Sequence, residues 1–319
     1  MLGIPRIAAS DVPRAEWVHF DGEDFRVSQR MLVRQSRNPL KGLAVVGTKV
    51  GLVAGAAFVS RSWGVALAAA AVAAQGHHFV AVAFMSVVYL VGGKKWTTRM
   101  SGIFVPSVCG AADAAFRPIR EELMKTMRGV VLDVGAGGGA YVKYSVMRGA
   151  AVARHVALEP NVHCHGAIRA AFAKEVGRAV ARGAAAETLP RLELEGAFLS
   201  EFAAKLGPAS VDWIILGNVL CELPEPGTQL RLLDGVLKPG GRVFFSEHVR
   251  DAEGSWVGAL QDAVAGWWER ISDGCVCNRR SLQLIRDNTS WELRHWTFHL
   301  GGMPWISRFE LGIAAKPPL

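Results

Sequence analysis

Cysteine is scarce in this chain, with five residues among 319, an odd number whose spacing follows no disulfide framework. This scarcity excludes a small secreted domain stapled by disulfides and indicates reduced thiols. Cys275 and Cys277 are too close in sequence for a usual zinc knuckle, and no second pair follows them. We therefore expect no metal site. The cysteines are Cys109, Cys164, Cys221, Cys275 and Cys277.

The first forty residues lack the marks of a targeting peptide. Five acidic residues argue against an intact secretory signal and an arginine-rich, acid-poor transit peptide, and Met1 argues against a removed presequence. Apolar periodicity is also too weak here to predict a core. The acidic residues are Asp11, Glu16, Asp21, Glu23 and Asp24.

Charge is nearly absent from Gly42 to Gly93, where Ala, Val, Leu, Gly and Phe dominate. Hydrophobic residues make up 50% of the chain and the mean hydropathy is +0.22, which is high for a soluble protein. The segments 42–60 and 63–93 are long enough to cross a bilayer at about 1.5 Å per residue. They predict a two-span transmembrane hairpin that turns near residues 60–62. The alternative is a buried alanine-rich helical pair, which Lys49 inside the first span favours.

Basic residues flank the predicted hairpin on both sides. By the positive-inside rule, both ends lie on the cytosolic or matrix face, in the endoplasmic reticulum or the mitochondrial inner membrane. His77 and His78, inside the second span, are interpreted as polar contacts between helices. The flanking residues are Arg26, Arg30, Arg34, Arg37 and Lys41 before the hairpin, and Lys94, Lys95 and Arg99 after it.

The five basic residues before the hairpin have helical spacing. We predict a basic helix that contacts anionic lipid headgroups or an acidic partner subunit. Nucleic acid is not an expected partner, because no aromatic residues interleave the stripe and the membrane flanks explain most of the net charge of +8. The domain boundaries predicted are an arm over 1–41, the hairpin over 42–93, a linker and helix over 94–122, and a large domain over 123–319.

A glycine-rich turn follows an apolar block in the large domain. The stretch VVLDVGAGGGAYV, residues 130–142, runs from a buried strand into Gly135, Gly137, Gly138 and Gly139 and then a helix. Glycines permit positive φ and the close approach of a ligand, and a helix N-terminus favours phosphate or another polar group. Read alone, the turn fits either a nucleotide cradle or a simple tight turn.

Apolar runs and helical stretches alternate after Ile103, which indicates a doubly wound parallel sheet. The last two runs are joined by only 301–304 and predict an antiparallel pair, so the fold class expected is α/β, with a seven-stranded Rossmann-like sheet ending in an antiparallel strand. The strands predicted are 130–134, 152–158, 179–182, 211–218, 242–247, 292–299 and 308–314, and the helices 163–176, 229–237 and 256–271.

Polar residues end several of these strands. Glu159 lies 24 residues after Gly135, where a second parallel strand brings a carboxylate to the ribose of a nucleotide over the first turn. Glu187 follows the predicted third strand and is expected to face the adenine. Asn218 ends the fourth strand, at the edge where open α/β sheets bind ligands.

Four segments in order resemble the successive motifs of class I methyltransferases that use S-adenosylmethionine. They are 131–139, 158–161, 211–216 and 237–243. Further segments, Ser246–Val249, Gln261–Trp268, Ser272–Cys275 and Ser290–Leu293, resemble a membrane-anchored family that methylates alkyl thiols. The resemblance covers about residues 123–316 and does not extend to the predicted hairpin, since that family usually has one short anchor.

The resemblance also implies site residues. Gly135, Gly137 and Gly139 would line the methionine part of the cofactor, with Asp133 in the same motif among the binding residues. Glu159 would hold the ribose and Glu187 the adenine, and Asn218 and Cys221 would lie near the methyl group. The residues implied for the acceptor pocket and catalysis are His248 and Asp273. Two departures are a segment from Leu189 to Gly207 that the family largely lacks, and Glu269 in place of a histidine.

Two functions follow from these expectations. The first is a membrane-anchored methyltransferase acting on a small lipophilic acceptor such as a thiol, with S-adenosylmethionine as cofactor. The second is a non-catalytic accessory subunit of a larger membrane complex, such as a mitochondrial one, built on the same fold and bound to its partners through the arm and hairpin.

Overall fold

A computed structural model of the chain describes residues 16–20, 23–27, 63–299 and 303–318. The strands are β1 (Glu16–Phe20), β2 (Glu23–Val27), β3 (Gly129–Val134), β4 (Val152–Leu158), β5 (Arg191–Glu195), β6 (Val211–Gly217), β7 (Leu237–His248), β8 (Glu292–His299) and β9 (Arg308–Ala315). The helices are α3 (Trp63–Leu123), α4 (Val142–Arg148), α5 (His165–Ala181), α6 (Leu199–Leu206), α7 (Pro226–Val236), α8 (Trp256–Ile271) and α9 (Ser281–Asn288). Short 3₁₀ turns cover Gly149–Ala151, Val162–Cys164, Ala186–Thr188 and Pro304–Ile306.

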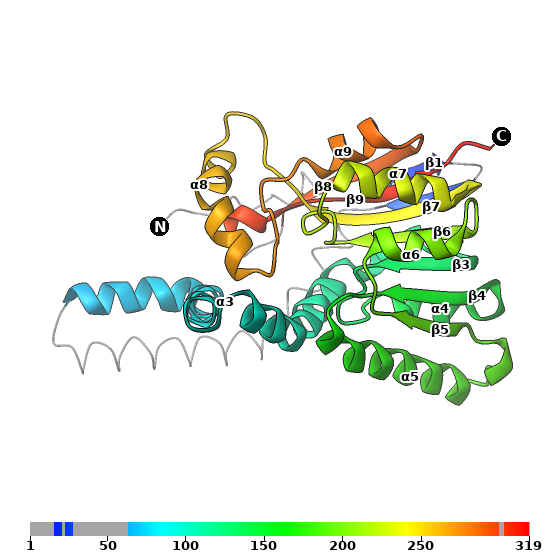
Figure 1. Cartoon of the computed structure of the whole chain (residues 1–319), viewed down its shortest axis with the longest axis horizontal. Coiled ribbons are helices and arrows are strands. Elements are labelled where there is room, and N and C mark those ends of the chain that lie inside the picture. The colour runs from blue at the N-terminus through cyan, green and yellow to red at the C-terminus, as the bar shows by residue number, and fades with distance from the viewer. Residues whose placement is uncertain (1–15, 21–22, 28–62, 300–302, 319) are drawn as a thin grey trace.

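Seven strands form one mixed sheet in the order β5-β4-β3-β6-β7-β9-β8 (Figure 1). Strand β3 is parallel to both β4 and β6, whereas β9 lies antiparallel between β7 and β8. The chain therefore enters the sheet at its centre and leaves through an antiparallel pair. The predicted fold class is confirmed for the sheet.

Side chains of alternating strand residues fill the two faces of this sheet, as the period of an extended chain requires. Leu132 and Val134 of β3 pack with α6, α7 and α9 on one face. Val131, between them, packs on the other face with the end of α3. Helices α4 and α5 contact each other on this second face (Figure 1). Because both faces are covered, the central strands are mostly apolar, with Asp133, His155 and Asp212 among the exceptions.

Helix α3 has 61 residues and changes direction at Gly93, whose φ of 61° and ψ of −159° are not helical. Its last turns pack on the sheet, and its earlier turns extend away from it (Figure 1). The first predicted span and the predicted turn lie outside the described residues. Within the part of the chain that the structure describes, no helix is long and apolar enough to cross a membrane. The two-span hairpin is therefore not supported.

The amino-terminal arm contributes to the core, which corrects the prediction. Strands β1 and β2 form an antiparallel hairpin, and Phe20 and Phe25 are buried beside Phe116 of α3. These two buried phenylalanines are one in each five-residue strand and give no periodic pattern, so the sequence alone did not predict their burial. Arg26 lies in β2, so the predicted basic helix does not begin there. The other members of the stripe lie outside the described residues.

The third strand was predicted in the wrong place. Residues 179–182 belong to the end of α5 and the turn after it, and the strand at this position of the sheet is β5. Strand β5 is an edge strand with one partner, so it alternates leucine with glutamate instead of forming an apolar run. The segment 189–207, predicted as an insertion, therefore consists of β5 and α6, both integral to the fold.

Candidate active site

The glycine turn lies at the carboxyl end of β3, in the middle of the sheet. Gly135 and Gly137 have φ values of 64° and 54°, which side chains rarely tolerate. The Gly135 amide donates a hydrogen bond of 2.8 Å to the Leu158 carbonyl of β4. A Cβ at Gly135 would lie 2.5 Å from Cγ2 of Val219, in the turn after β6. The glycines thus let the ends of β3, β4 and β6 approach one another.

Glu159 joins the end of β4 to this turn. One carboxylate oxygen accepts a hydrogen bond of 2.8 Å from the Gly137 amide, and the other accepts one of 2.8 Å from the Asn161 amide. Burial raises the pKa of the carboxyl group, and the two amide hydrogen bonds oppose this effect. Each oxygen keeps a second lone pair, which can accept a hydroxyl donor. The ribose contact predicted for Glu159 stays a prediction, and these free lone pairs leave room for it.

The ends of β6 and β7 are tied together by Asn218 and Glu247. The Asn218 side-chain oxygen accepts a hydrogen bond from the His248 amide at 3.3 Å. The Glu247 carboxylate accepts hydrogen bonds from the amides of Val219 at 3.0 Å and Leu220 at 3.3 Å. Burial raises the pKa of Glu247 to about 7 despite these bonds. Glu247 thereby fixes the turn that carries Cys221.

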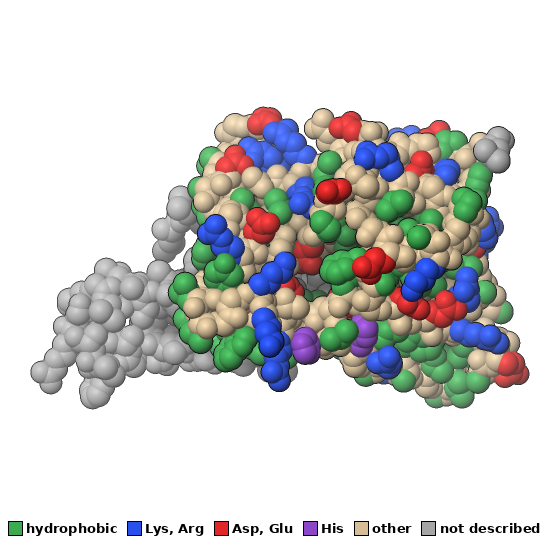
Figure 2. Space-filling view, viewed as in Figure 1, with side chains coloured by type: hydrophobic (Ala, Val, Ile, Leu, Met, Phe, Trp, Pro, Cys, Tyr) green, Lys and Arg blue, Asp and Glu red, His purple; other side chains and the backbone are tan. Residues whose placement is uncertain are grey.

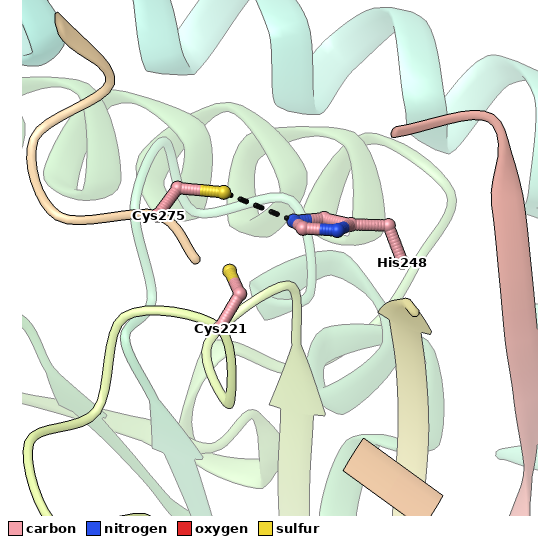
Figure 3. Close-up of side chains that lie close together, drawn as sticks. All are labelled: Cys221, His248 and Cys275. Carbon is pink, nitrogen blue, oxygen red and sulfur yellow. Dashed lines mark hydrogen bonds between the residues drawn. The ribbon is translucent and has the colours of Figure 1, made fainter. Parts of the chain in front are cut away.

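Cys221, His248 and Cys275 meet beside this turn (Figure 3). They come from the turn after β6, the end of β7 and the loop after α8, and all three are buried. The Cys275 sulfur lies 3.2 Å from Nε2 of His248 and accepts a hydrogen bond of 3.3 Å from the Trp268 indole. The cluster brings together the predicted residues Cys221 and His248, with Cys275 as a third member.

The two thiols of the cluster differ in acidity. A hydrogen bond from Cys221 and the nearby charge of His248 hold the pKa of Cys275 well below its usual range, against the effect of burial. The same hydrogen bond and burial raise the pKa of Cys221. Burial lowers the pKa of His248, but the charge of Cys275 outweighs it and the net shift is upward. The pKa shifts of Cys275 and His248 therefore run in opposite directions, each toward the charged form.

Helix α3 crosses the carboxyl edge of the sheet and covers the site. Its residue Thr98 donates a hydrogen bond of 2.6 Å to the Asp273 carboxylate, and the Thr98 carbonyl accepts one of 2.9 Å from the Asn161 side chain. Farther along the helix, Pro106 faces Gly138, where a Cβ would lie 2.4 Å from Cα of the proline. Figure 2 shows a hollow in this face of the molecule, with acidic side chains inside it.

Three predicted residues have other surroundings than Gly135, Gly137 and Glu159. Asp133 is buried within the sheet, with its carboxylate 3.3 Å from Nε2 of His155. Gly139 packs against α5, where a Cβ would lie 3.0 Å from Cα of Ile168. Glu187 is exposed in the 3₁₀ turn before β5 and therefore lies at the amino edge of the sheet, opposite the glycine turn. The structure does not bring Glu187 to the site, because the third strand follows it instead of preceding it.

Glu247, Cys275 and Thr98 received no role from the sequence. Glu247 directly precedes the predicted His248, and Cys275 lies two residues after the predicted Asp273. An acid at the carboxyl end of a buried strand was a usable signal for Glu247. Thr98 carries no signal, since its place over the site depends on the course of α3. Asp273 is also more constrained than predicted: its φ is 64° and its carboxylate is engaged by Thr98.

These residues fit the cofactor that the motifs imply. The glycines leave room along the end of β3, and the second lone pairs of Glu159 suit the two hydroxyls of a ribose. The hydrogen bond between Glu159 and Gly137 links both elements into one preformed cradle. Three of the predicted cofactor-binding residues, Gly135, Gly137 and Glu159, therefore lie together.

Comparison with solved structures returns many proteins with weak similarity. An O-methyltransferase family protein from Burkholderia thailandensis is 16% identical, covers 66% of this chain and 59% of its own, and has a TM-score of 0.46. The N-methyltransferase NodS from Bradyrhizobium japonicum, in complex with S-adenosyl-L-homocysteine, is 13% identical with a TM-score of 0.44. The match covers 63% of this chain and 84% of NodS.

Sequence comparison gives closer relatives over shorter stretches. Human thiol S-methyltransferase TMT1B is 36% identical over 77 residues, which are 24% of this chain and 32% of the relative. Human thiol S-methyltransferase TMT1A is 31% identical over 102 residues, covering 28% and 42%. The chain thus spans about a third of the length of the first of these relatives. A family model described as a methyltransferase domain matches residues 111–312. The chain therefore belongs to the methyltransferase domain family, and S-adenosylmethionine is the cofactor that this membership implies.

Proposed function

We propose that this protein transfers a methyl group from S-adenosylmethionine to the sulfur of a small thiol. The observation that carries the proposal is that the Glu159 cradle and the Cys221, His248 and Cys275 cluster occupy the carboxyl ends of neighbouring strands. The partial similarity to two human thiol S-methyltransferases supports the same acceptor class.

The cofactor, when bound, supplies a sulfonium methyl group: a sulfur–carbon bond to the acceptor forms while the methyl–sulfonium bond breaks, and its electron pair stays on the departing sulfur. The chain mainly has to align the two sulfurs and exclude water. Glu159 and the glycine turn hold the donor side, and α3 with Trp268 covers the acceptor side. Because a free thiol has a pKa of about 8.5, no strong base is required.

Of the two residues predicted for catalysis, His248 reaches the acceptor side. Its Nε2 faces the sulfurs of the cluster, on the side of the cradle where we place the acceptor. Asp273 is engaged by Thr98 and serves to fix α3 over the site. We therefore assign His248 to the acceptor and Asp273 to positioning.

The proposal predicts selectivity for sulfur. We expect the purified chain with S-adenosylmethionine to methylate a short alkyl thiol at least about 100-fold faster than the alcohol of the same chain length, because the thiol ionises far more readily near neutral pH. Mass spectrometry of the methylated products measures both rates. Equal rates would contradict the thiol assignment, and failure to bind S-adenosylmethionine would favour the accessory-subunit hypothesis.

Membrane attachment stays a prediction, and exposed apolar side chains on α3 support it. Leu90 is 81% exposed and Val91 is 70% exposed, and Trp96 and Ile103 follow on the same helix. Apolar surface of this kind favours burial in a lipid interface or against another protein. We expect the chain to float with phosphatidylcholine vesicles in a density gradient. Replacing Leu90 and Val91 by serine should reduce flotation several-fold, and full recovery at the bottom of the gradient for the wild type would contradict the prediction.

A further inference from the structure

The arrangement of Cys221, His248 and Cys275 resembles three corners of a tetrahedral metal site. Their two sulfurs and one ring nitrogen all lie within 4.8 Å of one another, and Cys275 Sγ is 3.2 Å from His248 Nε2. Zinc bound by two thiolates and one imidazole needs separations of about 3.5 to 3.8 Å, from bonds of about 2.3 Å to sulfur and 2.0 Å to nitrogen. Small side-chain rotations bridge this difference.

The charge of the cluster also suits a divalent ion. Two thiolates cancel the two positive charges of zinc, and a neutral imidazole completes a site without net charge. Such neutrality matters because the three side chains are buried, with exposed fractions of 1% for Cys221, 6% for His248 and 7% for Cys275. Two cysteines and one histidine are a ligand set that zinc uses in catalytic sites, where a fourth position is left open.

The surrounding residues hold the three ligands in place. Trp268 donates an indole hydrogen bond of 3.3 Å to the Cys275 sulfur, an outer contact that orients a metal-bound thiolate. The Val276 amide donates a hydrogen bond of 3.0 Å to the Cys221 carbonyl, so the two cysteine-bearing loops are joined directly. Glu247 fixes the turn before Cys221 from the other side. The site is therefore largely formed before any ion enters.

Apolar side chains close the cluster against water. Trp305 and Ile271 pack around the two cysteines, and Met85 and Tyr89 of α3 cover them. Exclusion of water strengthens the attraction between a metal ion and thiolate ligands. The same apolar surroundings favour an apolar acceptor over water at an open coordination position.

We propose that Cys221, His248 and Cys275 bind one zinc ion whose open fourth position takes the sulfur of the acceptor. This role rests on the proposed thiol methylation. On binding, the acceptor thiol loses its proton to solvent and coordinates zinc as a thiolate, because a coordinating thiol is deprotonated outright. The site then serves as the acceptor-binding and acceptor-activating centre, beside the cofactor cradle.

Metal content and ligand substitutions test the site. The full chain is produced with zinc in the medium and purified without chelator, and zinc is counted by elemental mass spectrometry. We expect about one zinc ion per chain in the wild type. Cys221→Ser and Cys275→Ser should each weaken zinc binding about 100-fold or more. Cys277→Ser is the matched control, because this buried thiol contacts the Gln261 carbonyl at 3.7 Å instead of the cluster.

Activity after metal removal tests the role. Chelation should reduce thiol methylation at least about 10-fold while S-adenosylmethionine still binds, and added zinc should restore it. Cobalt in place of zinc should give thiolate-to-metal absorption in the wild type, a readout that does not depend on folding of any variant. A wild-type protein purified without bound zinc, or with a Cys221–Cys275 disulfide instead, would overturn the zinc site. Undiminished methylation after chelation would overturn the role of zinc in binding the acceptor. Loss of cofactor binding would instead count against the proposed function, with zinc content unaffected.

Discussion

Replacing Glu159 with glutamine lowers the affinity for S-adenosylmethionine about 100-fold, the loss expected when a charge-assisted hydrogen-bond partner is removed from a buried site. The carboxylate accepts amide hydrogen bonds on both oxygens, from Gly137 and Asn161. A glutamine side chain has one oxygen and one NH2 group, so it must turn a donor toward one of these amides. The substitution therefore leaves one backbone donor unpaired and removes acceptor positions from the ribose.

Glu187→Gln is the control for this experiment, because the sequence predicted an adenine contact for Glu187 and the structure places it at the opposite edge of the sheet. We expect its affinity for the cofactor to match the wild type within a factor of about two. Calorimetric titration of all three proteins with S-adenosylmethionine and S-adenosylhomocysteine gives the comparison. Equal affinities for wild type and Glu159→Gln would remove Glu159 from the cofactor site, and a large loss in Glu187→Gln would contradict the observed strand order.

Much of the sheet could be predicted because its central strands are buried on both faces. Strands β3, β4 and β6 are rich in apolar residues, with only one or two polar residues in each, and glycine or proline clusters bound the helices between them. Strand β5 was missed because an edge strand buries only one row of side chains and alternates with charge. That single error displaced Glu187 and turned β5 and α6 into an apparent insertion.

The site residues on strand ends could also be predicted from the sequence, whereas those in loops could not. Gly135, Gly137 and Glu159 could be placed because strand order brings the carboxyl ends of β3 and β4 together. Cys275 could not, because its position depends on how the loop after α8 folds back onto β6 and β7. The spacing of Cys275 and Cys277 drew attention to the wrong pair: the partner of Cys275 in space is Cys221.

The course of α3 differs most from the sequence-based prediction. An apolar composition alone predicts a membrane span, yet the helix continues past Gly93 into turns that contact both halves of the site through Thr98. Polar contacts of this kind require a fixed position over the sheet. The segment 94–122, which the sequence assigned to a linker and helix, therefore forms the cover of the candidate active site.

The position of α3 depends on a buried ionic cluster around Asp113. The Asp113 carboxylate accepts hydrogen bonds from Lys143 and from Tyr144 of α4, the latter at 2.7 Å. Arg120 lies two helical turns farther along α3 and is 2% exposed. Its guanidinium nitrogen Nη1 is 3.4 Å from the Asp113 carboxylate. Its guanidinium also stacks 4.7 Å from the centre of the Tyr141 ring. Asp113 thus pairs with Lys143 and Arg120 at the joint between α3 and α4.

Asp113→Asn should lower the free energy of unfolding by about 3 to 5 kcal/mol, because it leaves the Arg120 charge buried without its carboxylate. Arg117→Gln is the matched control: Arg117 contacts the same carboxylate at 3.5 Å but its side chain is 49% exposed, so we expect a loss below about 1 kcal/mol. Urea unfolding of the three proteins at pH 7 measures both differences. Similar losses for the two variants would show that burial of the cluster does not govern its contribution.

The same cluster predicts how this difference changes with pH. Burial acts to raise the pKa of Asp113, but hydrogen bonds from Lys143 and Tyr144 and the charges of Lys143 and Arg120 outweigh it, so the pKa falls below its usual value of 3.8. A carboxyl group whose pKa is lower in the folded state stabilises the fold above its unfolded pKa and loses that contribution as pH falls through the folded pKa. The gap between wild type and Asp113→Asn should therefore hold from pH 7 to about pH 5 and shrink below about pH 4. A gap independent of pH would mean that the ionised carboxylate is not what anchors α3.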